Sequence, residues 1–396
     1  MTTNAFLTPS IITKETLEIL ENNLVMAGKV NRQFENQFAK IGQTLTIRKP
    51  NKFLITIGPG LSLQNITEPQ VSITVNTQAQ VAFQFSSAEL TLTIEEFSER
   101  YCKPAAVKIA NYIDQQVYLN YTSFSNLVGT YTTVPATFAA LAAVGQRLDE
   151  LAAPQNDRVL VLTPAAYWSL ANGFNNLYVT KVSESALKGF LANIANFMIF
   201  MDQNALQAHT YGTLAGTPVV NGAGQTGSSI VTNGWTASSA ILNQGDVINF
   251  AGVNQTNPES LISTGSLKGF VVTAAVTADS GGNATIPIFP GITTTGAFQN
   301  SSASPANGAA VTFPGTPTGS TAYFNNFGFC RDAIGLVTVP LELPDGVDFR
   351  AREMWKGVSM RMIRAYDINS DVFPLRVDVL FGTAQYYDDL GVRMAQ

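Results

Sequence analysis

Residues 93–122, TIEEFSERYCKPAAVKIANYIDQQVYLNYT, form the longest uninterrupted helical pattern in the chain. Thr93 and Glu96 have the spacing of a capping box, which marks a helix start. Pro104 cannot donate a backbone hydrogen bond and clashes with the preceding turn. The pattern therefore predicts a short helix at 94–102, a break, and a second helix from Pro104 to about residue 122. The apolar stripe of this second helix contains Ile109, Ile113 and Val117.

Two strand-like segments precede these helices, at residues 43–57 and 71–85. The second segment alternates apolar and polar residues, which is typical of a strand with one buried face. Gly58-Pro59-Gly60 predicts a loop between the segments, so together they form a long hairpin. Because an isolated hairpin is marginally stable in water, this one either joins a sheet of its own domain or reaches across a neighbouring subunit. Its apolar face comprises Val71, Ile73, Val75, Val81, Phe83 and Phe85.

An amphipathic helix is predicted near the N-terminus, from Thr8-Pro9-Ser10 to about Gly28. Such a helix either packs on the core or serves as an arm that docks on a neighbouring subunit. Beyond residue 122 the pattern predicts an ordinary α/β region. Its expected helices lie at 137–151, from Pro164 onward and at 183–189, and its expected strands at 158–162 and 197–201.

The composition changes abruptly over residues 213–325, where Gly, Ser, Thr, Asn and Ala dominate. Short apolar runs at 247–250, 270–276 and 284–288 alternate there with turn clusters. This spacing predicts a small antiparallel barrel or sandwich inserted into the α/β region, in preference to a disordered segment. The charged side chains of the segment are Asp246, Glu259, Lys268 and Asp279. The closing strands are predicted at 334–341, 358–365 and 375–381.

The overall composition suits a protein that buries much of its surface in an assembly. The 396 residues are enough for two or three domains with a sizeable core. Charged residues make up 13%, about half of the roughly 25% that is usual in soluble domains. The net charge of −5 argues against a dedicated nucleic-acid clamp, because such domains are usually basic.

The sequence also predicts the compartment. The two cysteines, Cys102 and Cys330, do not indicate a disulfide framework, which favours a reducing environment. The N-terminal MTTNAFLTPS lacks the basic-then-apolar order of a signal peptide. No apolar run reaches the roughly 18–20 residues that span a bilayer. We therefore expect a soluble protein that is made in the cytoplasm.

Motifs for catalysis and cofactor binding are missing from the sequence. His209 is the only histidine, which leaves no Ser-His-Asp or Cys-His arrangement. No Cys/His cluster has the spacing of a zinc site, and no glycine-rich phosphate loop lies between a strand and a helix. We expect no catalytic residue, no cofactor, no metal and no enzymatic activity.

Seven segments resemble one known family, in the same order. They are LTPSIITKETLEILENNLVMAGKVNRQF (7–34), GQTLTIRKP (42–50), LTIEEFSERYCKPAA (92–106), GDVINFAGV (245–253), SLKGFVVTAAVTADSGGNATIPIFPGI (266–292), FCRDAIGLVTVPLELP (329–344) and YDINSDVFPLRVDVLFG (366–382). These segments resemble the major capsid, or coat, proteins of tailed bacteriophages. The resemblance is to the P-twenty-two-like branch of the Hong Kong 97 capsid fold.

The resemblance implies an α+β fold with a defined division of the chain. Residues 1–41 would be an N-terminal arm, and 42–88 an extended E-loop hairpin that overlies an adjacent subunit. Residues 89–122 and 357–396 would form the peripheral domain with its spine helix. Residues 123–212 and 326–356 would form the axial domain, and 213–325 the inserted β-barrel domain. Pro104 would set the angle between the exit helix of the hairpin and the spine.

The resemblance further implies a major capsid protein that assembles into hexamers and pentamers of an icosahedral head around double-stranded DNA, without sequence-specific binding. Its expected partners are other copies of itself and the scaffolding and portal proteins of the same phage, with a decoration protein as an optional partner and no membrane. The expected location is the virion, after synthesis and assembly in the host bacterial cytoplasm.

Two other functions stay open at this point. An encapsulin-like compartment subunit shares the fold, but such shells usually lack an inserted domain. A glycan-binding protein could use the polar β-rich insert. Some members of the wider fold join subunits through a Lys–Asn isopeptide bond, for which Lys49 and Lys52 are candidates. The P-twenty-two-like branch is not known for this chemistry, so we expect no cross-link.

Overall fold

The computed structural model describes residues 26–34, 44–61, 63–66, 68–86, 103–173, 194–355, 358–370 and 372–396. Several features predicted from the sequence lie outside these residues. They are Thr93, Glu96, Cys102, the helices expected at 94–102 and 183–189, and most of the N-terminal helix. The chain divides into two units, one comprising 1–48, 70–118 and 334–384, the other 49–69, 119–333 and 385–396.

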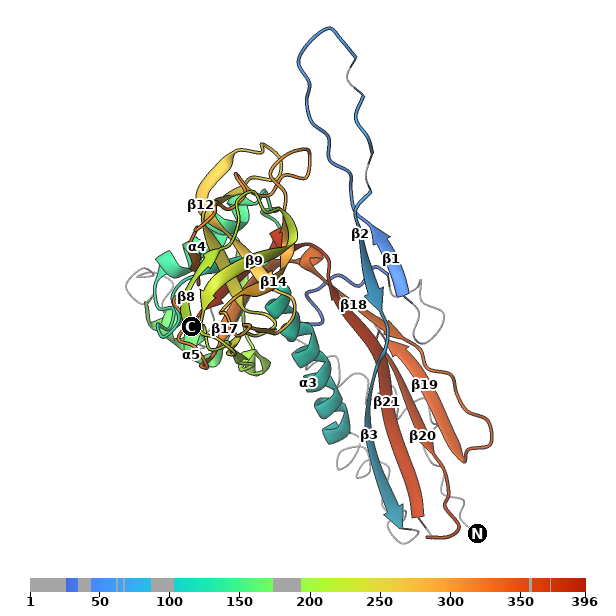
Figure 1. Ribbon diagram of the computed structural model, residues 1–396. Helices are drawn as coiled ribbons and strands as arrows, with labels where there is room; N and C mark the ends of the chain where they lie inside the picture. Colours follow the sequence, from blue (N-terminus) through green and yellow to red (C-terminus); the bar gives the residue numbers. More distant parts are fainter. Residues whose placement is uncertain are drawn as a thin grey trace, which may run out of the picture. The chain divides into compact units, whose positions relative to one another are not determined.

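The first unit is built on an antiparallel sheet around its longest strand, β21 (Val372–Gln385). β20 (Val358–Arg364) and β3 (Thr77–Ser86) pair with β21, and β19 (Phe349–Trp355) pairs with β20 (Figure 1). β18 (Ile334–Val339) completes the sheet. The buried face of this sheet includes Met360, Met362, Leu375, Val377 and Val379.

The helix predicted after Pro104 is present as α3 (Lys103–Leu119), and a short 3₁₀ turn, Asn120–Ser123, follows it. Pro104 is the second residue of α3, a position where its missing N–H costs nothing because first-turn amides have no helical partner. The predicted stripe is buried at Ile109, Ile113 and Val117. On the same unit, the ring of Tyr112 meets Phe381 of β21 edge-on at 6.1 Å.

The two arms of the predicted hairpin pair with each other only near its base, and the rest of the second arm joins a sheet of its own unit. Its first arm, expected at 43–57, is a strand only over β1 (Thr44–Arg48). Its second arm is broken at residues 75–76 into β2 (Gln70–Thr74), which pairs with β1, and β3, which pairs with β21. The physical reason is that the apolar face of β3 finds a matching apolar strand in its own unit, so it does not need the first arm.

The second unit contains a sheet in the order β4 (Leu127–Val128), β22 (Gly391–Ala395), β17 (Asn325–Cys330), β5 (Arg158–Leu162) and β6 (Phe197–Met201). All five residues of β5 are buried, as its continuous apolar run predicts. The predicted helices are present as α4 (Phe138–Glu150) and α5 (Pro164–Gly173). Leu141, Val144 and Leu148 of α4 share a core with Leu160 and Phe197.

Strand pairing moves two of the expected domain boundaries. Residues 326–356 were assigned to the axial part, yet β18 and β19 pair within the first unit. Residues 357–396 were assigned to the peripheral part, yet β22 lies between β4 and β17 in the second unit. The sequence pattern predicted β18 but carries no information about its partner strand, and β19 and β22 were not predicted.

The polar segment 213–325 is ordered β-structure. Its entry and exit strands, β7 (His209–Thr210) and β16 (Ala322–Tyr323), pair with each other. A six-stranded sheet runs in the order β15 (Val311–Thr312), β11 (Val247–Thr256), β12 (Ser263–Val272), β14 (Ala284–Ile292), β9 (Gly227–Trp235) and β8 (Gly216–Val220). β10 (Ala240–Leu242) pairs with β13 (Val276–Thr277).

The two edges of this six-stranded sheet meet. A bridge joins Val219 to Ala310, and the amide of Val220 donates to the carbonyl oxygen of Ala309 over 2.9 Å. The side chains between the strands form one apolar core, which includes Ile230, Trp235, Phe250, Phe270 and Ile286. In the described part of the chain, no helix has the length and apolar character needed to cross a membrane.

Candidate assembly interface

The loop Lys49–Pro69 joins β1 to β2 (Figure 1). It exposes a run of large apolar side chains. Ile55 is 94% exposed and Ile57 is 96% exposed. Phe53, Leu61, Leu63 and Ile66 are exposed as well. Exposed apolar side chains that follow one another in this way mark a surface that binds another protein. The loop is therefore the strongest candidate for an interface in the described chain.

The two arms of this loop are held together by a side chain instead of a strand ladder. The amide of Leu54 donates to Oε1 of Gln64 over 2.9 Å, and Nε2 of Gln64 donates back to the carbonyl oxygen of Leu54. The Gln64 amide thus takes the place of a backbone partner. At the base of the loop, the amide of Lys49 donates to the carbonyl oxygen of Pro69 over 2.8 Å. The loop is closed at two points, while its apolar side chains stay in solvent.

Lys49 is the partly buried end of the loop. Its ammonium group lies 4.6 Å from the centre of the Tyr387 ring, in cation–π geometry. Burial lowers the pKa of Lys49, and the nearby carboxylates of Asp389 and Asp388 act in the opposite direction. This lysine fixes the loop base, a role that the sequence did not predict.

A buried carboxylate on α3 anchors the segment that leads out of the N-terminal region. Oδ1 of Asp114, which is fully buried, accepts from the amides of Met26 at 2.7 Å and Ala27 at 3.4 Å. A buried carboxylate needs such donors to be tolerated. Sequence reasoning missed Asp114, although an acidic residue beside Ile113 on an otherwise apolar helix face was the available signal.

The polar face of the first sheet is organised by Asp378. This fully buried carboxylate accepts from Nε of Arg361 at 2.9 Å and from its Nη2 at 2.6 Å. Nε2 of Gln78, on β3, donates to Oδ2 of Asp378 over 2.8 Å, and Nε of Arg376 lies 2.9 Å from the same oxygen. Asp378 therefore links β3, β20 and β21 on the face opposite the apolar core.

His209 lies at the root of the polar segment, in a structural position. Its Nε2 is 2.7 Å from Oδ1 of Asp246, and Oδ2 of Asp246 accepts from the amides of Gly212 and Asn243. The buried guanidinium of Arg393 donates to the carbonyl oxygen of Gly245 over 2.8 Å. The side chains at this root therefore bond one another or the backbone: His209 contacts Asp246, and Arg393 donates to a carbonyl oxygen.

Three tyrosine hydroxyls are buried close to this root. The hydroxyls of Tyr131 and Tyr211 are 3.1 Å apart, and Tyr131 also donates to Oδ1 of Asn325 over 2.9 Å. Burial raises the pKa of Tyr121 to about 12 and also raises the pKa of both Tyr131 and Tyr211. The phenols stay protonated and act as hydrogen-bonding groups.

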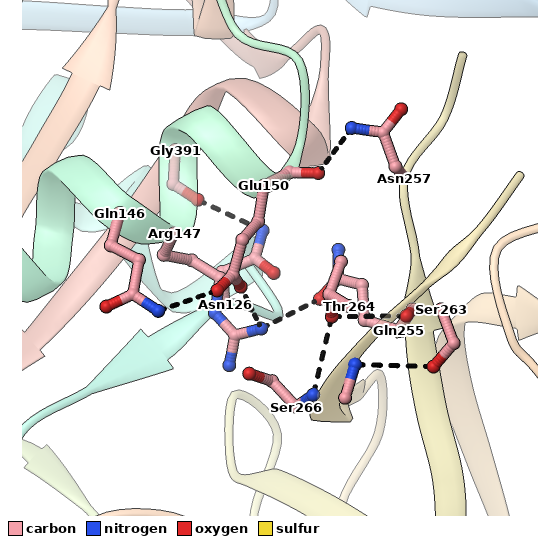
Figure 2. A network of polar contacts seen from close by, with 11 residues as sticks. Asn126, Gln146, Arg147, Glu150, Gln255, Asn257, Ser263, Thr264, Ser266 and Gly391 are labelled. Carbon is pink, nitrogen blue, oxygen red and sulfur yellow. Dashed lines mark hydrogen bonds and ion pairs between the residues drawn. The ribbon is translucent and has the colours of Figure 1, made fainter. Parts of the chain in front are cut away.

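A second polar network joins the segment 213–325 to α4 (Figure 2). Nη1 of Arg147 lies 3.3 Å from Oε1 of Gln255, and Nδ2 of Asn257 donates to the carbonyl oxygen of Glu150 over 2.8 Å. Gln146 and Arg147 both contact the Glu150 carboxylate, so the last turn of α4 is itself braced. The β11–β12 hairpin is thereby seated on the end of α4.

The residues singled out in the sequence differ in how deeply the structure buries them. Ile73 and Val75 are buried, whereas Val71, Val81 and Phe83 are partly buried. Phe85 is described by its backbone alone, opposite Phe373 in the register of β3 and β21. Pro104 is exposed. A role of any of these residues in assembly stays a prediction.

Metal-binding and redox chemistry receive no support from the described residues, which bring together no group of three or more His, Cys, Asp or Glu that could hold a metal ion. Cys330 is a free, buried thiol whose pKa burial raises to about 11, so it stays protonated.

Several solved structures of phage proteins are similar to this chain. A chain from Mycobacterium phage Che8 has a TM-score of 0.51 at 11% identity, with 94% of this chain and 90% of that chain covered. A chain from the mature capsid of bacteriophage PhiM1 has a TM-score of 0.47 at 9% identity, covering 94% and 86%. One from the capsid of cyanophage P-SCSP1u has a TM-score of 0.45 at 10% identity, covering 90% and 84%.

The likeness to the chain from phage Che8 is a likeness of overall fold. A search among curated proteins finds no match. The family model described as "P22 coat protein - gene protein 5" matches residues 1–395. A match over nearly the whole chain, together with a capsid-like fold and an exposed apolar loop, shows that this chain belongs to the P22 coat protein family and is a major capsid protein of a bacteriophage.

Proposed function

We propose that this coat protein forms the hexamers and pentamers of an icosahedral phage head that encloses double-stranded DNA. The observation that carries the proposal is the loop Lys49–Pro69, in which Ile55 and Ile57 are almost completely exposed. A free subunit gains nothing from solvated apolar side chains, whereas a shell buries them at every repeated contact. The loop of one subunit covers an adjacent subunit.

Under this proposal the elements correspond to those of the Hong Kong 97 fold. The loop with β1 and β2 is the E-loop, and residues 1–41 are the N-terminal arm. α3 is the spine of the peripheral domain, together with β3, β18, β19, β20 and β21. The sheet of β4, β22, β17, β5 and β6 with its two helices is the axial domain.

Residues 213–325 are proposed as the inserted β-barrel domain of this branch. The bridge between Val219 and Ala310 supports it, since a sheet whose edges pair with each other has closed. Such an insert also speaks against an encapsulin-like compartment. A glycan-binding function has only the polar character of the insert in its favour.

Scaffolding and portal proteins of the same phage are the proposed partners during assembly, and a decoration protein is an optional one. The subunit is made in the cytoplasm of the host bacterium, has no catalytic activity and forms no isopeptide cross-link. Its net charge of −5 suits a shell wall that DNA passes without adhering to it.

Assembly of purified protein with its scaffolding protein tests the proposal, with electron microscopy as the measurement. We expect closed particles tens of nanometres across from the wild type. The double variant Ile55→Ser with Ile57→Ser should remain as soluble subunits or small oligomers. Ile368→Ser is the matched control, because it replaces an isoleucine that is 80% exposed outside the loop. Normal particles from the double variant would rule out the loop as the contact.

A further inference from the structure

The insert presents very few charges to its surroundings. Of the four ionisable side chains in 213–325, Asp246 and Lys268 are buried, at 0% and 1% exposure. Asp279 is exposed, but its carboxylate accepts from the amides of Gly281 and Asn283, each over 2.8 Å. No described residue bonds the exposed carboxylate of Glu259. Glu259 is therefore the one charged group of the insert that is available for a new contact.

Glu259 lies on a stiff tip between β11 and β12, residues 257–262. The amide of Leu261 donates to the carbonyl oxygen of Asn257, and the amide of Asn257 donates to that of Ile262, both over 2.9 Å. Oδ1 of Asn257 accepts from the amides of Glu259 and Ser260 over 3.0 Å. The tip is closed on itself, so its shape does not depend on a partner.

The tip is also fixed from below. Asn257 bonds the carbonyl oxygen of Glu150, and Gln255 contacts Arg147, which places the tip on the end of α4 (Figure 2). It carries Ile262, which is 69% exposed and is the most exposed large apolar side chain among the described residues of the insert. A rigid support with one free carboxylate and one apolar side chain is suited to holding a cationic, apolar segment.

The loop Lys49–Pro69 supplies such a segment. Nζ of Lys52 donates to the carbonyl oxygen of Pro258, the residue before Glu259, over 3.2 Å. Lys52 is partly buried by this contact, whereas every residue from Phe53 to Gly60 is exposed. The tip thus touches the loop at the point where its apolar run begins.

We propose that the β11–β12 tip is a support for the assembly loop of its own subunit. The tip holds Lys52 through the Pro258 carbonyl, while the Glu259 carboxylate, on the next residue, adds a negative charge that favours the lysine at this place. The contact thereby orients the exposed isoleucines for capture by a second copy of the chain. This inference rests on the proposed role of the loop in assembly. The insert then has a function within its own subunit, and this function requires no contact between the inserts of different subunits.

A charge reversal at the tip tests the proposal in the full-length protein. Glu259→Lys places a second cation beside Lys52, so we expect faster hydrogen exchange at residues 51–57 of the free subunit and assembly slowed about two- to fivefold. The double variant Lys52→Ala with Glu259→Lys should behave like Lys52→Ala alone, because the reversed charge then has no cation to repel. Asp279→Lys is the matched control, since it reverses the other exposed carboxylate of the insert and should change neither exchange nor assembly.

The two measurements separate this inference from the proposed function. If Glu259→Lys behaves like Asp279→Lys in hydrogen exchange, the support does not exist, whatever the loop does in assembly. If Glu259→Lys speeds exchange equally in the Lys52→Ala background, the tip acts through something other than the charge of Lys52 and the inference is overturned. Failure of the Ile55 and Ile57 variants to impair assembly would instead remove the proposed function and leave the exchange result standing.

Discussion

The loop at 49–69 and the strand β3 have the same kind of sequence and opposite surroundings. Both contain repeated apolar residues, and both belong to one predicted hairpin: β3 to its second arm, and residues 49–69 to its first arm and connecting loop. Along β3, Ala79, Val81 and Phe83 lie opposite an apolar strand of their own chain and are partly buried. In the loop, Ile55 and Ile57 have no covering strand and are almost fully exposed. An apolar strand pattern demands a cover but does not say whether the cover comes from the same chain.

The first prediction concerns the sheet that contains β3, β20 and β21. Asp378→Ala removes the carboxylate that links β3, β20 and β21 and leaves the partly buried Arg361 without its carboxylate partner. We expect the free energy of unfolding to fall by about 3–5 kcal/mol, measured by urea denaturation. Asp345→Ala is the control, because Asp345 also pairs with an arginine but is exposed. A similar loss for both variants would contradict a special role of Asp378.

The second prediction compares a buried isoleucine of β2 with an exposed isoleucine of the loop. Ile73→Ala, at a fully buried position on β2, should lower the free energy of unfolding by about 2–5 kcal/mol because it leaves a cavity. Ile55→Ala should leave stability nearly unchanged and reduce the rate of particle formation. Denaturation of the free subunit and light scattering during assembly measure the two effects. A stability loss at Ile55 equal to that at Ile73 would mean that the loop is covered within its own subunit.

The third prediction concerns Pro104, in the first turn of α3. Pro104→Ala should leave the free energy of unfolding within about 1 kcal/mol, because Pro104 lies exposed in the first turn of α3. It should disturb the geometry or maturation of the shell if the proline sets the direction in which the chain enters the spine. Electron microscopy of assembled particles measures this effect. Particles of normal size and shape from the variant would refute the role.

The smallest effect is expected at Gln64. Gln64→Ala removes both hydrogen bonds to Leu54 and leaves backbone groups that water satisfies, so folding stability should change by less than about 1 kcal/mol. The loop arms should separate, which hydrogen exchange at residues 53–57 would detect. Gln84→Ala, at an exposed position of β3, is a suitable control. Unchanged exchange in Gln64→Ala would show that the clasp does not order the loop.

The sequence by itself determined most of the local structure. Helical periodicity predicted α3 and α4 to within a few residues, and Pro164 marked the start of α5. Continuous apolar runs predicted β5 and β6, and the strand patterns near the end of the chain predicted β18, β20 and β21. It succeeded because these elements bury one face or a whole segment, and burial imposes a repeat of 3.6 or 2 residues on the chain. The ordered family segments gave the capsid fold and the coat protein function, which the family match bears out.

Only the tertiary structure decided how these elements are paired. It gave β3 to β21 and not to the first arm, moved β18 and β19 out of the axial part, and brought Asp114 and Asp378 to buried positions with partners distant in sequence. Pairing depends on which complementary surfaces meet in space, and a one-dimensional pattern records the apolar face of a strand without its partner. The exposed loop shows the same limit most clearly, because its sequence marks an apolar surface and only the fold shows that the chain leaves it uncovered.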